Sequence, residues 1–207
     1  MTRVIVIRPE PGCSATVGAA RAQGMKADAF PLFAVSPCDW TLPEQMPDAL
    51  LVGSANAFRH GGEQLRALTG VPVHVVGEAT ANAARQAGFT VAVTGRGGLQ
   101  PVLSAIGPGS HVLRLSGEER IELDVPAGVT VEERVVYASR PVPMPPELAD
   151  LLAEDDCLIL LHSGVAADHL RRECLRLNLP MERIALAALA PRIAALAGDG
   201  WSRVETA

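Results

Sequence analysis

The stretch Leu-Val-Gly-Ser at residues 51–54 decides the fold, because it recurs as Leu-Leu-His-Ser at residues 160–163. In both places two apolar residues end an expected strand, and a polar residue precedes an expected helix. Each tetrapeptide therefore reads as a strand-to-helix turn. A turn of this kind that occurs twice in one chain indicates an internal repeat.

The repeat extends beyond these two turns. Residues 73–88 read as strand, turn, Ala-rich helix and glycine, and residues 184–198 read in the same way. The opening segment Val-Ile-Val-Ile-Arg at residues 4–8 is echoed by Val-Leu-Arg-Leu at residues 112–115. Two similar α/β halves therefore share this chain.

Short β-branched runs alternate with Ala-rich helical stretches, a pattern typical of parallel sheets covered by helices. The expected strands are residues 4–7, 27–35, 49–53, 73–76, 90–93, 111–115, 129–139, 158–161, 184–189 and 203–205. The expected helices are residues 14–23, 80–87, 147–152, 166–177 and 192–197, with two more beginning near residues 55 and 98.

The pattern breaks at residues 36–40 and again at residues 141–146, where four prolines crowd one short segment. We therefore predict a discontinuous first α/β domain of residues 1–36 plus 141–207, and a second of residues 37–140. Two strands would cross between them. A cleft between two α/β domains is a favoured place for a ligand.

Composition excludes several classes of protein. The chain has 207 residues, of which 48% are hydrophobic and 20% charged, so it is not disordered. Its longest apolar runs fall short of the roughly 18 residues that span a bilayer. The apolar run at the N-terminus ends at Arg8, too soon for a signal peptide, so we expect a cytoplasmic protein. A net charge of -5 argues against a nucleic-acid binder.

Neither cysteine nor histidine spacing indicates a metal site. The four cysteines contain no C-x-x-C pair, which favours free thiols over zinc or a redox dithiol. Among the basic residues only Lys26 is a lysine. The other basic residues are arginines, which suit carboxylate recognition, but a bias of the whole genome toward arginine is the favoured explanation.

Four strand-to-helix turns carry polar groups. Ser54 and Ser163 lack the G-x-S-x-G context of a serine hydrolase, so they either cap helices or contact a substrate. The run Gly-Arg-Gly-Gly at residues 95–98 is neither a dinucleotide fingerprint nor a P-loop, and is either a plain turn or a carboxylate site at Arg96. Thr80 at an expected helix start either caps the helix or, with the Gly77 backbone, holds an anion.

Several segments in order resemble uroporphyrinogen-III synthases. They are Val-Ile-Val-Ile-Arg-Pro-Glu-Pro (4–11), Ala-Phe-Pro-Leu-Phe (29–33), Leu-Val-Gly-Ser-Ala-Asn-Ala (51–57), Val-Val-Gly-Glu-Ala-Thr-Ala (75–81), Ala-Gly-Phe (87–89) and Val-Val-Tyr (135–137). Each segment is short, and their order and spacing over nearly the whole chain make the resemblance specific. The fold that it implies is the split two-domain arrangement already expected from the repeat.

The resemblance implies a reaction without cofactor or metal. Hydroxymethylbilane, a linear tetrapyrrole with eight carboxylates, would lose its hydroxyl and close to uroporphyrinogen III with ring D inverted. The enzyme would be a lyase and a monomer, with at most transient contact to the enzyme that precedes it in the pathway. Its substrate-binding residues would be Arg8, Ser54, Asn56, Gly77, Thr80, Arg96 and Ser163.

Tyr137, the single tyrosine, is the candidate catalytic residue. A strand tyrosine usually packs against its neighbours. The resemblance instead implies that it assists loss of the hydroxyl, and a phenol is protonated at neutral pH and able to donate. His162 is a secondary acid candidate, with a purely structural role as the other reading.

The chain also departs from the family pattern. We align Gly77-Glu78-Ala79-Thr80 with Ala188-Leu189-Ala190-Pro191, where the family has glycine and threonine, and Gly-Ser at 53–54 stands for the usual Thr-Ser. These changes leave open a non-catalytic or weakened paralogue that binds tetrapyrroles or carboxylates. A nucleotide-binding regulator is a third reading, disfavoured because the glycine fingerprints are missing.

Overall fold

The structure, a computed structural model, describes residues 2–206. The chain forms two compact units, unit 1 from residues 1–34 with 140–207 and unit 2 from residues 35–139. The boundaries fall inside strands β3 (Phe33–Pro37) and β8 (Thr130–Pro141). The predicted domains, residues 1–36 with 141–207 and residues 37–140, remain a prediction.

Unit 1 is built on one five-stranded sheet, with the order β11-β10-β9-β1-β2 and parallel pairing throughout. Its strands are β1 (Arg3–Val6), β2 (Ala27–Ala29), β9 (Cys157–Leu161), β10 (Ile184–Ala188) and β11 (Arg203–Thr206). Its helices are α1 (Gly12–Ala22), α5 (Pro146–Glu154), α6 (Gly164–Arg176), the short 3-10 helix η2 (Met181–Arg183) and α7 (Pro191–Ala197).

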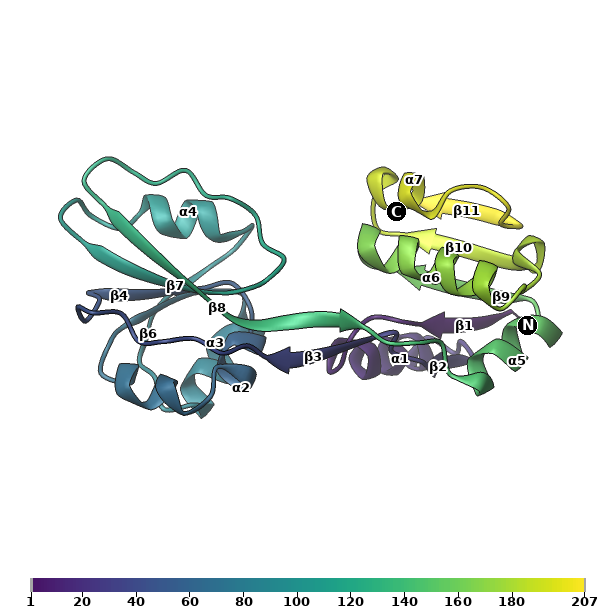
Figure 1. Cartoon of the computed structure of the whole chain (residues 1–207), viewed down its shortest axis with the longest axis horizontal. Coiled ribbons are helices and arrows are strands. Elements are labelled where there is room, and N and C mark those ends of the chain that lie inside the picture. The colour runs from purple at the N-terminus through teal and green to yellow at the C-terminus, as the bar shows by residue number, and fades with distance from the viewer. Residues whose placement is uncertain (1, 207) are drawn as a thin grey trace. The chain divides into compact units, whose positions relative to one another are not determined.

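The two faces of this sheet bury alternate residues of each strand, as the two-residue period of a strand requires. Ile5, Ile159 and Leu186 face one side, where they pack against helices α5, α6 and α7. Val4 and Val6 face the other side, against helix α1. Helices on both faces explain why the strands read as continuous apolar runs rather than as alternating ones (Figure 1).

Unit 2 contains a six-stranded sheet with the order β3-β8-β7-β4-β5-β6. Besides β3 and β8, its strands are β4 (Ala49–Val52), β5 (Val73–Val76), β6 (Val91–Gly95) and β7 (His111–Gly117). Its helices are α2 (Asn56–His60), the 3-10 helix η1 (Glu63–Leu68), α3 (Glu78–Gln86) and α4 (Leu99–Ser104).

This sheet is also covered on both faces. Leu50 and Leu113 pack toward the α2, η1 and α3 side, whereas Leu51 and Val112 pack toward α4. Figure 1 shows α4 on the opposite side of the sheet from α2 and α3. All four residues of β4 are buried, as expected of a central strand in a doubly covered parallel sheet.

The internal repeat is confirmed strand by strand. The order β2-β1-β9-β10-β11 of unit 1 corresponds to β8-β7-β4-β5-β6 of unit 2. The register supports this match, because Leu160 pairs with Val6 and its counterpart Leu51 pairs with Arg114. Arg114 therefore occupies the position that Val6 occupies in unit 1.

The register corrects the predicted alignment of the second half. Leu161 pairs with Ala188, and its counterpart Val52 pairs with Val75, so Ala188 corresponds to Val75 rather than to Gly77. Counting on from there, the residue equivalent to Gly77 is Ala190. Both residues stand immediately before a helix, at the N-caps of α3 and α7. The alignment of 77–80 with 188–191 is wrong by two residues, because β10 and its turn hide the offset in a run of small apolar residues.

One predicted strand, residues 27–35, is also wrong. The structure has β2 at Ala27–Ala29 and a separate β3 at Phe33–Pro37, with Phe30-Pro31-Leu32 between them. Pro31 has no amide hydrogen to give to a ladder, so it ends the first strand. The proline at the end of β3 is tolerated because β3 lies at the edge of its sheet.

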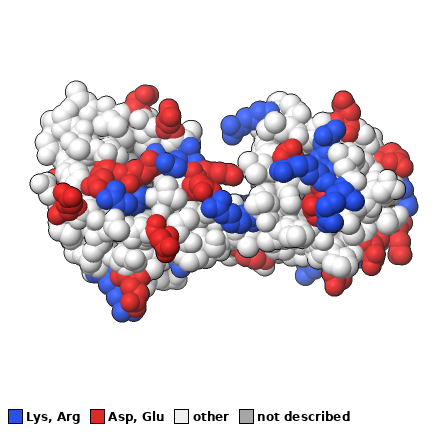
Figure 2. Space-filling view, in the orientation of Figure 1, with Lys and Arg blue, Asp and Glu red and all other residues white. Residues whose placement is uncertain are grey.

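Charges are intermixed on the surface. Figure 2 shows blue and red side chains close together on both units, without a large area of one sign on the face displayed. Among residues 2–206, no helix has the length and apolar character that crossing a membrane requires.

Candidate functional site

A cavity of about 220 Å³ opens in unit 2 where the parallel strands end. Its walls come from the turns that follow β4, β5, β6 and β7, and from β8. The lining residues are Gly53, Ser54, Val76, Gly98, Leu99, Arg114, Leu115, Ser116, Gly117, Glu119, Arg120, Ile121 and Tyr137. Two predicted site residues, Tyr137 and Ser54, thus lie at the same cavity.

The topology of the sheet explains why a cavity forms here. The chain runs from β4 outward to β5 and β6, then returns to β7 on the opposite side of β4. The turns after β4 and β7 therefore lead away from each other and leave a crevice. The carboxyl ends of strands at such a switch point are the usual ligand site of open α/β sheets.

Tyr137 is half-buried on β8, opposite Gly117 of β7. A Cβ atom at residue 117 would lie 2.7 Å from two ring carbons of Tyr137 and 2.9 Å from its hydroxyl oxygen. Only glycine leaves room for the phenol at this place. The Glu118 amide donates to the Tyr137 carbonyl at 3.0 Å and ties the loop after β7 to the same residue.

Ser54 forms the turn after β4. Its Oγ accepts a hydrogen bond from the Asn56 amide at 3.2 Å, which stabilises the start of α2. The Asn56 side chain accepts a hydrogen bond from Arg59 and is not among the residues that line the cavity. Ser54 therefore combines a turn-forming role with access to the cavity.

The turn after β5 differs from what the sequence indicated. Gly77 is the N-cap of α3, with φ of 77°, and its amide donates to the Gly95 carbonyl. Thr80 lies inside the first turn of α3, 5% exposed, so the reading of Thr80 as a helix cap is wrong. The structural counterpart of Thr80 is Ile193, which is also buried, and a contact of Thr80 or of the Gly77 backbone with an anion remains a prediction.

Arg96 lies in the tight turn between β6 and α4. The φ angles of 79° at Gly97 and 119° at Gly98 explain why glycines fill this turn. Gly98 lines the unit 2 cavity, whereas Arg96 is exposed and is not among the lining residues. The turn reading of this motif therefore holds, and a carboxylate contact by Arg96 remains a prediction.

Unit 1 has the equivalent switch point between β1 and β9. Arg8 follows β1, and Ser163 caps α6 by accepting a hydrogen bond from the Ala166 amide at 3.2 Å. The Arg8 guanidinium lies over Gly12, where a Cβ would approach its Nε to 2.6 Å. Arg8 and Ser163 thus both follow the carboxyl ends of adjacent strands of unit 1, β1 and β9.

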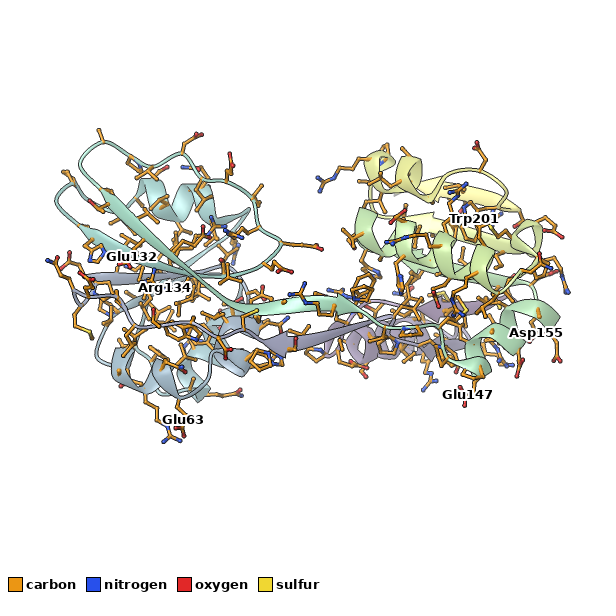
Figure 3. The ribbon with its side chains drawn as sticks, in the orientation of Figure 1. Glu63, Glu132, Arg134, Glu147, Asp155 and Trp201 are labelled. Atoms are coloured by element: carbon orange, nitrogen blue, oxygen red, sulfur yellow. The ribbon has the colours of Figure 1, made fainter. Side chains whose placement is uncertain are left out.

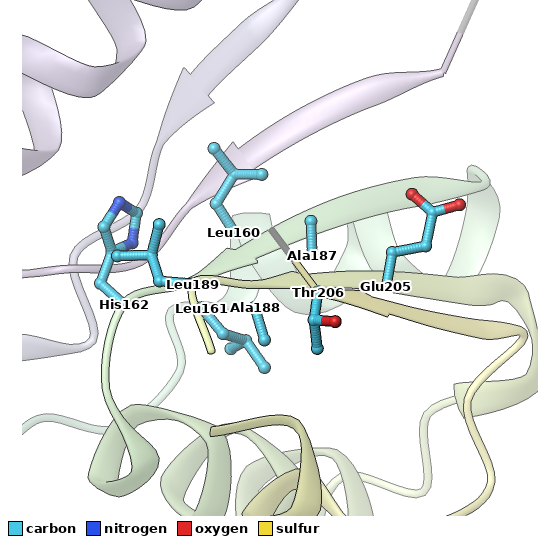
Figure 4. A pocket seen from close by; sticks show the side chains of 8 residues that line it. All are labelled: Leu160, Leu161, His162, Ala187, Ala188, Leu189, Glu205 and Thr206. Atoms are coloured by element: carbon cyan, nitrogen blue, oxygen red, sulfur yellow. The ribbon is translucent and has the colours of Figure 1, made fainter. Parts of the chain in front are cut away.

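A second cavity, of about 280 Å³, lies at this edge of unit 1 (Figure 4). It is mostly apolar, with Leu160, Leu161, Ala187, Ala188 and Leu189 in its wall beside His162, Glu205 and Thr206. Leu189 is 58% exposed. The apolar run at the end of β10 and after it, Ala187 to Leu189, therefore forms part of a cavity wall.

Comparison with known proteins identifies the family. The model of a family described as "Uroporphyrinogen-III synthase HemD" matches residues 14–207, nearly the whole chain. The chain belongs to the uroporphyrinogen-III synthase family. No curated protein sequence matches it significantly.

Solved uroporphyrinogen-III synthases share the fold at low sequence identity. The enzyme from Helicobacter pylori is 16% identical, with a TM-score of 0.60 over 94% of this chain and 87% of the other. A mutant of the Thermus thermophilus enzyme is 19% identical, with a TM-score of 0.51 over 99% of this chain and 92% of the other. The α/β fold with two mainly parallel sheets is thereby confirmed as the fold of this family.

His162 of this family member is poorly suited to act as a cationic acid. Burial, and then the nearby positive charge of Arg8, lower the pKa of its imidazole, while a backbone hydrogen bond at Leu160 opposes them. Its Nδ1 is buried and has no hydrogen-bond partner among the described residues. A neutral imidazole can still donate or accept one hydrogen bond at the wall of the unit 1 cavity.

Arg114 is a residue at the cavity that sequence reasoning missed. It is 6% exposed and lies within the strand β7, where charged residues are rare. The signal was present, since an arginine interrupts the apolar run Val-Leu-Arg-Leu at residues 112–115. Among residues 2–206, no group of three or more His, Cys, Asp or Glu side chains could hold a metal ion.

Proposed function

We propose that this chain closes hydroxymethylbilane to uroporphyrinogen III, with loss of water and inversion of ring D, and that it is therefore a lyase. The observation that carries the proposal is the position of Tyr137. In a chain of the uroporphyrinogen-III synthase family, its half-buried side chain lines a cavity at the switch point of a parallel sheet. A proton donor is thus held where this fold class binds its ligands.

The reaction requires little covalent chemistry from the protein. The C–O bond of the terminal hydroxymethyl group breaks, and the oxygen leaves as water after it takes a proton. The cation that remains is attacked by the substituted carbon of the last pyrrole, which gives a spiro intermediate that rearranges and loses a proton. Because the unassisted ring closes without inversion, the main task of the protein is to hold one conformation of the chain.

Tyr137 is the donor for the leaving hydroxyl. Gly117 leaves space for the phenol, and the hydrogen bond from the Glu118 amide to the Tyr137 carbonyl fixes the backbone. Ser54 lies at the same cavity, with its hydroxyl hydrogen available to the substrate while its oxygen accepts from Asn56. General acid catalysis by one such group contributes roughly 10²–10⁴-fold.

The charge of the substrate must be met locally. Eight carboxylates meet a protein of net charge -5, so net charge supplies no long-range attraction. Arginines and exposed amides at the ends of the strands provide the local contacts. A monomeric state, a cytoplasmic location and catalysis without a cofactor remain predictions that accompany this function.

The alternative of a non-catalytic binding module has no observation in its favour. The family match and the tyrosine at the cavity favour the enzyme. The apolar wall at Ala188 and Leu189 is compatible with either, because pyrrole rings are themselves largely apolar.

A coupled assay tests the function. Hydroxymethylbilane is generated in situ, this protein is added, and the type I and type III products are separated after oxidation to porphyrins. We expect type III to predominate with the protein and type I to form without it. The proposal fails if the product remains type I at every protein concentration while the substrate is consumed.

A further inference from the structure

Arg114 occupies a position where the equivalent half of the molecule has a buried valine. Val6, its counterpart in β1, is fully buried against helix α1. Arg114 is only 6% exposed, and it borders the unit 2 cavity. A buried arginine is expensive unless its charge and hydrogen-bond donors are matched, so a specific partner is expected.

The protein itself matches this arginine only in part. The Nη2 atom donates to the Ile121 carbonyl at 2.9 Å. The Nε atom lies 3.4 Å from Oε1 of Glu133, its cross-strand neighbour, without forming a hydrogen bond. Both Nε of Arg114 and Oε1 of Glu133 are buried without a hydrogen-bond partner among the described residues.

Glu133 is moreover shared by two arginines. The Nε atom of Arg120 lies 2.9 Å from the same Glu133 oxygen as an ion pair that lacks hydrogen-bond geometry, and Arg120 also lines the cavity. Two guanidinium groups against one carboxylate leave an excess positive charge at the cavity wall. Glu119, which is exposed like Arg120, lines the same wall and can offset this charge, so the unmatched Nε of Arg114, rather than net charge, favours an anionic ligand there.

The other carboxylate on this strand is already engaged. Glu132 is paired with Arg134 and with His111, and Figure 3 shows Glu132 and Arg134 next to each other on β8. Residues 132 and 134 share one face of the strand, whereas 133 points to the other. Within the described part of the chain, Glu133 is thus the β8 carboxylate that Arg114 and Arg120 share.

We propose that Arg114, with Arg120, binds one carboxylate of the substrate in the unit 2 cavity. The inference rests on the proposed function, because it assigns the ligand as an acetate or propionate side chain of a pyrrole ring. A guanidinium fork is suited to such a group. The pyrrole that carries this carboxylate would lie beside Ser54 and Tyr137, which line the same cavity.

A double variant separates this role from a purely structural one. Arg114→Gln removes the charge and leaves Glu133 with Arg120 alone. Adding Glu133→Gln removes the carboxylate as well and restores the net charge that the cluster has in the wild type. If Arg114 merely neutralises Glu133, the double variant regains the affinity that the single variant loses. If Arg114 binds substrate, both variants stay weak.

The measurements are KM and kcat in the coupled assay and the Kd of uroporphyrinogen III, kept reduced under nitrogen. We expect Arg114→Gln and Arg114→Gln/Glu133→Gln to raise Kd and KM by about 10- to 100-fold, with kcat changed much less. Arg66→Gln is the matched control in unit 2, since its side chain is 83% exposed and is not at the cavity; it should leave both constants unchanged.

Wild-type affinity in the double variant would overturn the proposal. If the single variant does not fold, Arg120→Gln is tested instead, because the Arg120 side chain is 36% exposed. We expect it to lose affinity by about 3- to 10-fold. No loss of affinity in this variant would count against the proposed pair of arginines. A wild-type protein that binds uroporphyrinogen III but forms only type I product refutes the proposed function alone. One that neither forms nor binds it refutes both.

Discussion

Tyr137 and Gly117 act together at the residue scale. The ring of Tyr137 occupies the space that a side chain at residue 117 would fill, and the two residues are paired across β7 and β8. The phenol can therefore adopt this orientation only because residue 117 has no side chain. This arrangement gives two substitutions that test one catalytic group in different ways.

Replacing Tyr137 by phenylalanine removes the proton donor and keeps the shape of the ring. We expect kcat to fall by roughly 10²-fold or less, near the low end for a general acid, because the hydroxyl of the substrate leaves readily and its own carboxyls can assist. The free energy of unfolding should be almost unchanged, since the ring keeps its packing against the core of unit 2. An unchanged kcat would exclude Tyr137 from the mechanism.

Replacing Gly117 by alanine keeps the donor and displaces it. The new methyl would lie within 2.7 Å of the ring, so Tyr137 must move. A displacement of about 1 Å at a reacting group can reduce the rate by up to 10²-fold, so we expect a loss comparable to that of Tyr137→Phe. The combined variant should be little worse than either alone. Full additivity of the two losses would show that Gly117 acts independently of Tyr137.

Sequence reasoning found the polar residues that short motifs carry and missed one that interrupts a core strand. Ser54 and Tyr137 were accessible because short motifs carry them. Arg114 was missed because its neighbours read as a core strand, and only the register against Glu133 shows what surrounds it. Thr80 was wrongly interpreted as a helix cap because threonine is a common capping residue. The N-cap of α3 is Gly77.

At the scale of elements, helix starts differ in how they satisfy their free amides. Ser163 caps α6 with its side chain, whereas α3 and α7 have no side-chain cap at all. Most predicted elements match the observed ones to within two residues, because doubly covered strands and Ala-rich helices have strong patterns. The strand expected at 27–35 failed where one proline outweighs the apolar run around it.

Ser163 allows its two suggested roles to be separated. Ser163→Ala removes the cap of α6 and should lower the free energy of unfolding by about 1 kcal/mol. Ser163→Asp preserves the cap and adds a favourable charge at the helix N-terminus, so stability should be retained. If Ser163 also contacts a substrate carboxylate, Ser163→Asp should raise KM through repulsion. Chemical denaturation and steady-state kinetics on both variants decide, and an unchanged KM in Ser163→Asp leaves capping as the single role.

At the scale of the whole molecule, the internal repeat made the two similar α/β units predictable. The repeat could not predict which contacts hold the chain where it re-enters unit 1 after β8. There the backbone of the Pro-rich segment is held by α6, because the Met144 amide donates to Glu173 at 2.7 Å and the His169 ring contacts the Val142 carbonyl at 2.8 Å. No short motif encodes contacts between residues so far apart in sequence.

Glu173 makes the stability of the molecule depend on pH. Hydrogen bonds from Arg176 lower the pKa of its carboxyl from 4.5 to about 2, assisted by the Met144 amide and by the charges of Arg176 and His169, while burial opposes them. The folded-state pKa lies below that of the unfolded chain. The stabilisation is therefore complete above about pH 4.5 and is lost as the pH falls toward 2.

We expect Glu173→Gln to lower the free energy of unfolding by about 1–2 kcal/mol at pH 7, with the value reduced because Arg176 is half exposed. The difference from the wild type should persist down to pH 5 and shrink between pH 4.5 and 3, because the wild-type carboxylate then loses its advantage over the unfolded chain. Denaturant titrations at a series of pH values measure this difference. Asp168→Asn on the same helix is the control, since its ion pair with Arg172 is exposed and should contribute only a few tenths of a kcal/mol. If the difference between Glu173→Gln and the wild type stays constant from pH 7 to pH 3, the variant is destabilised by poorer packing. The charge of Glu173 then contributes nothing to stability.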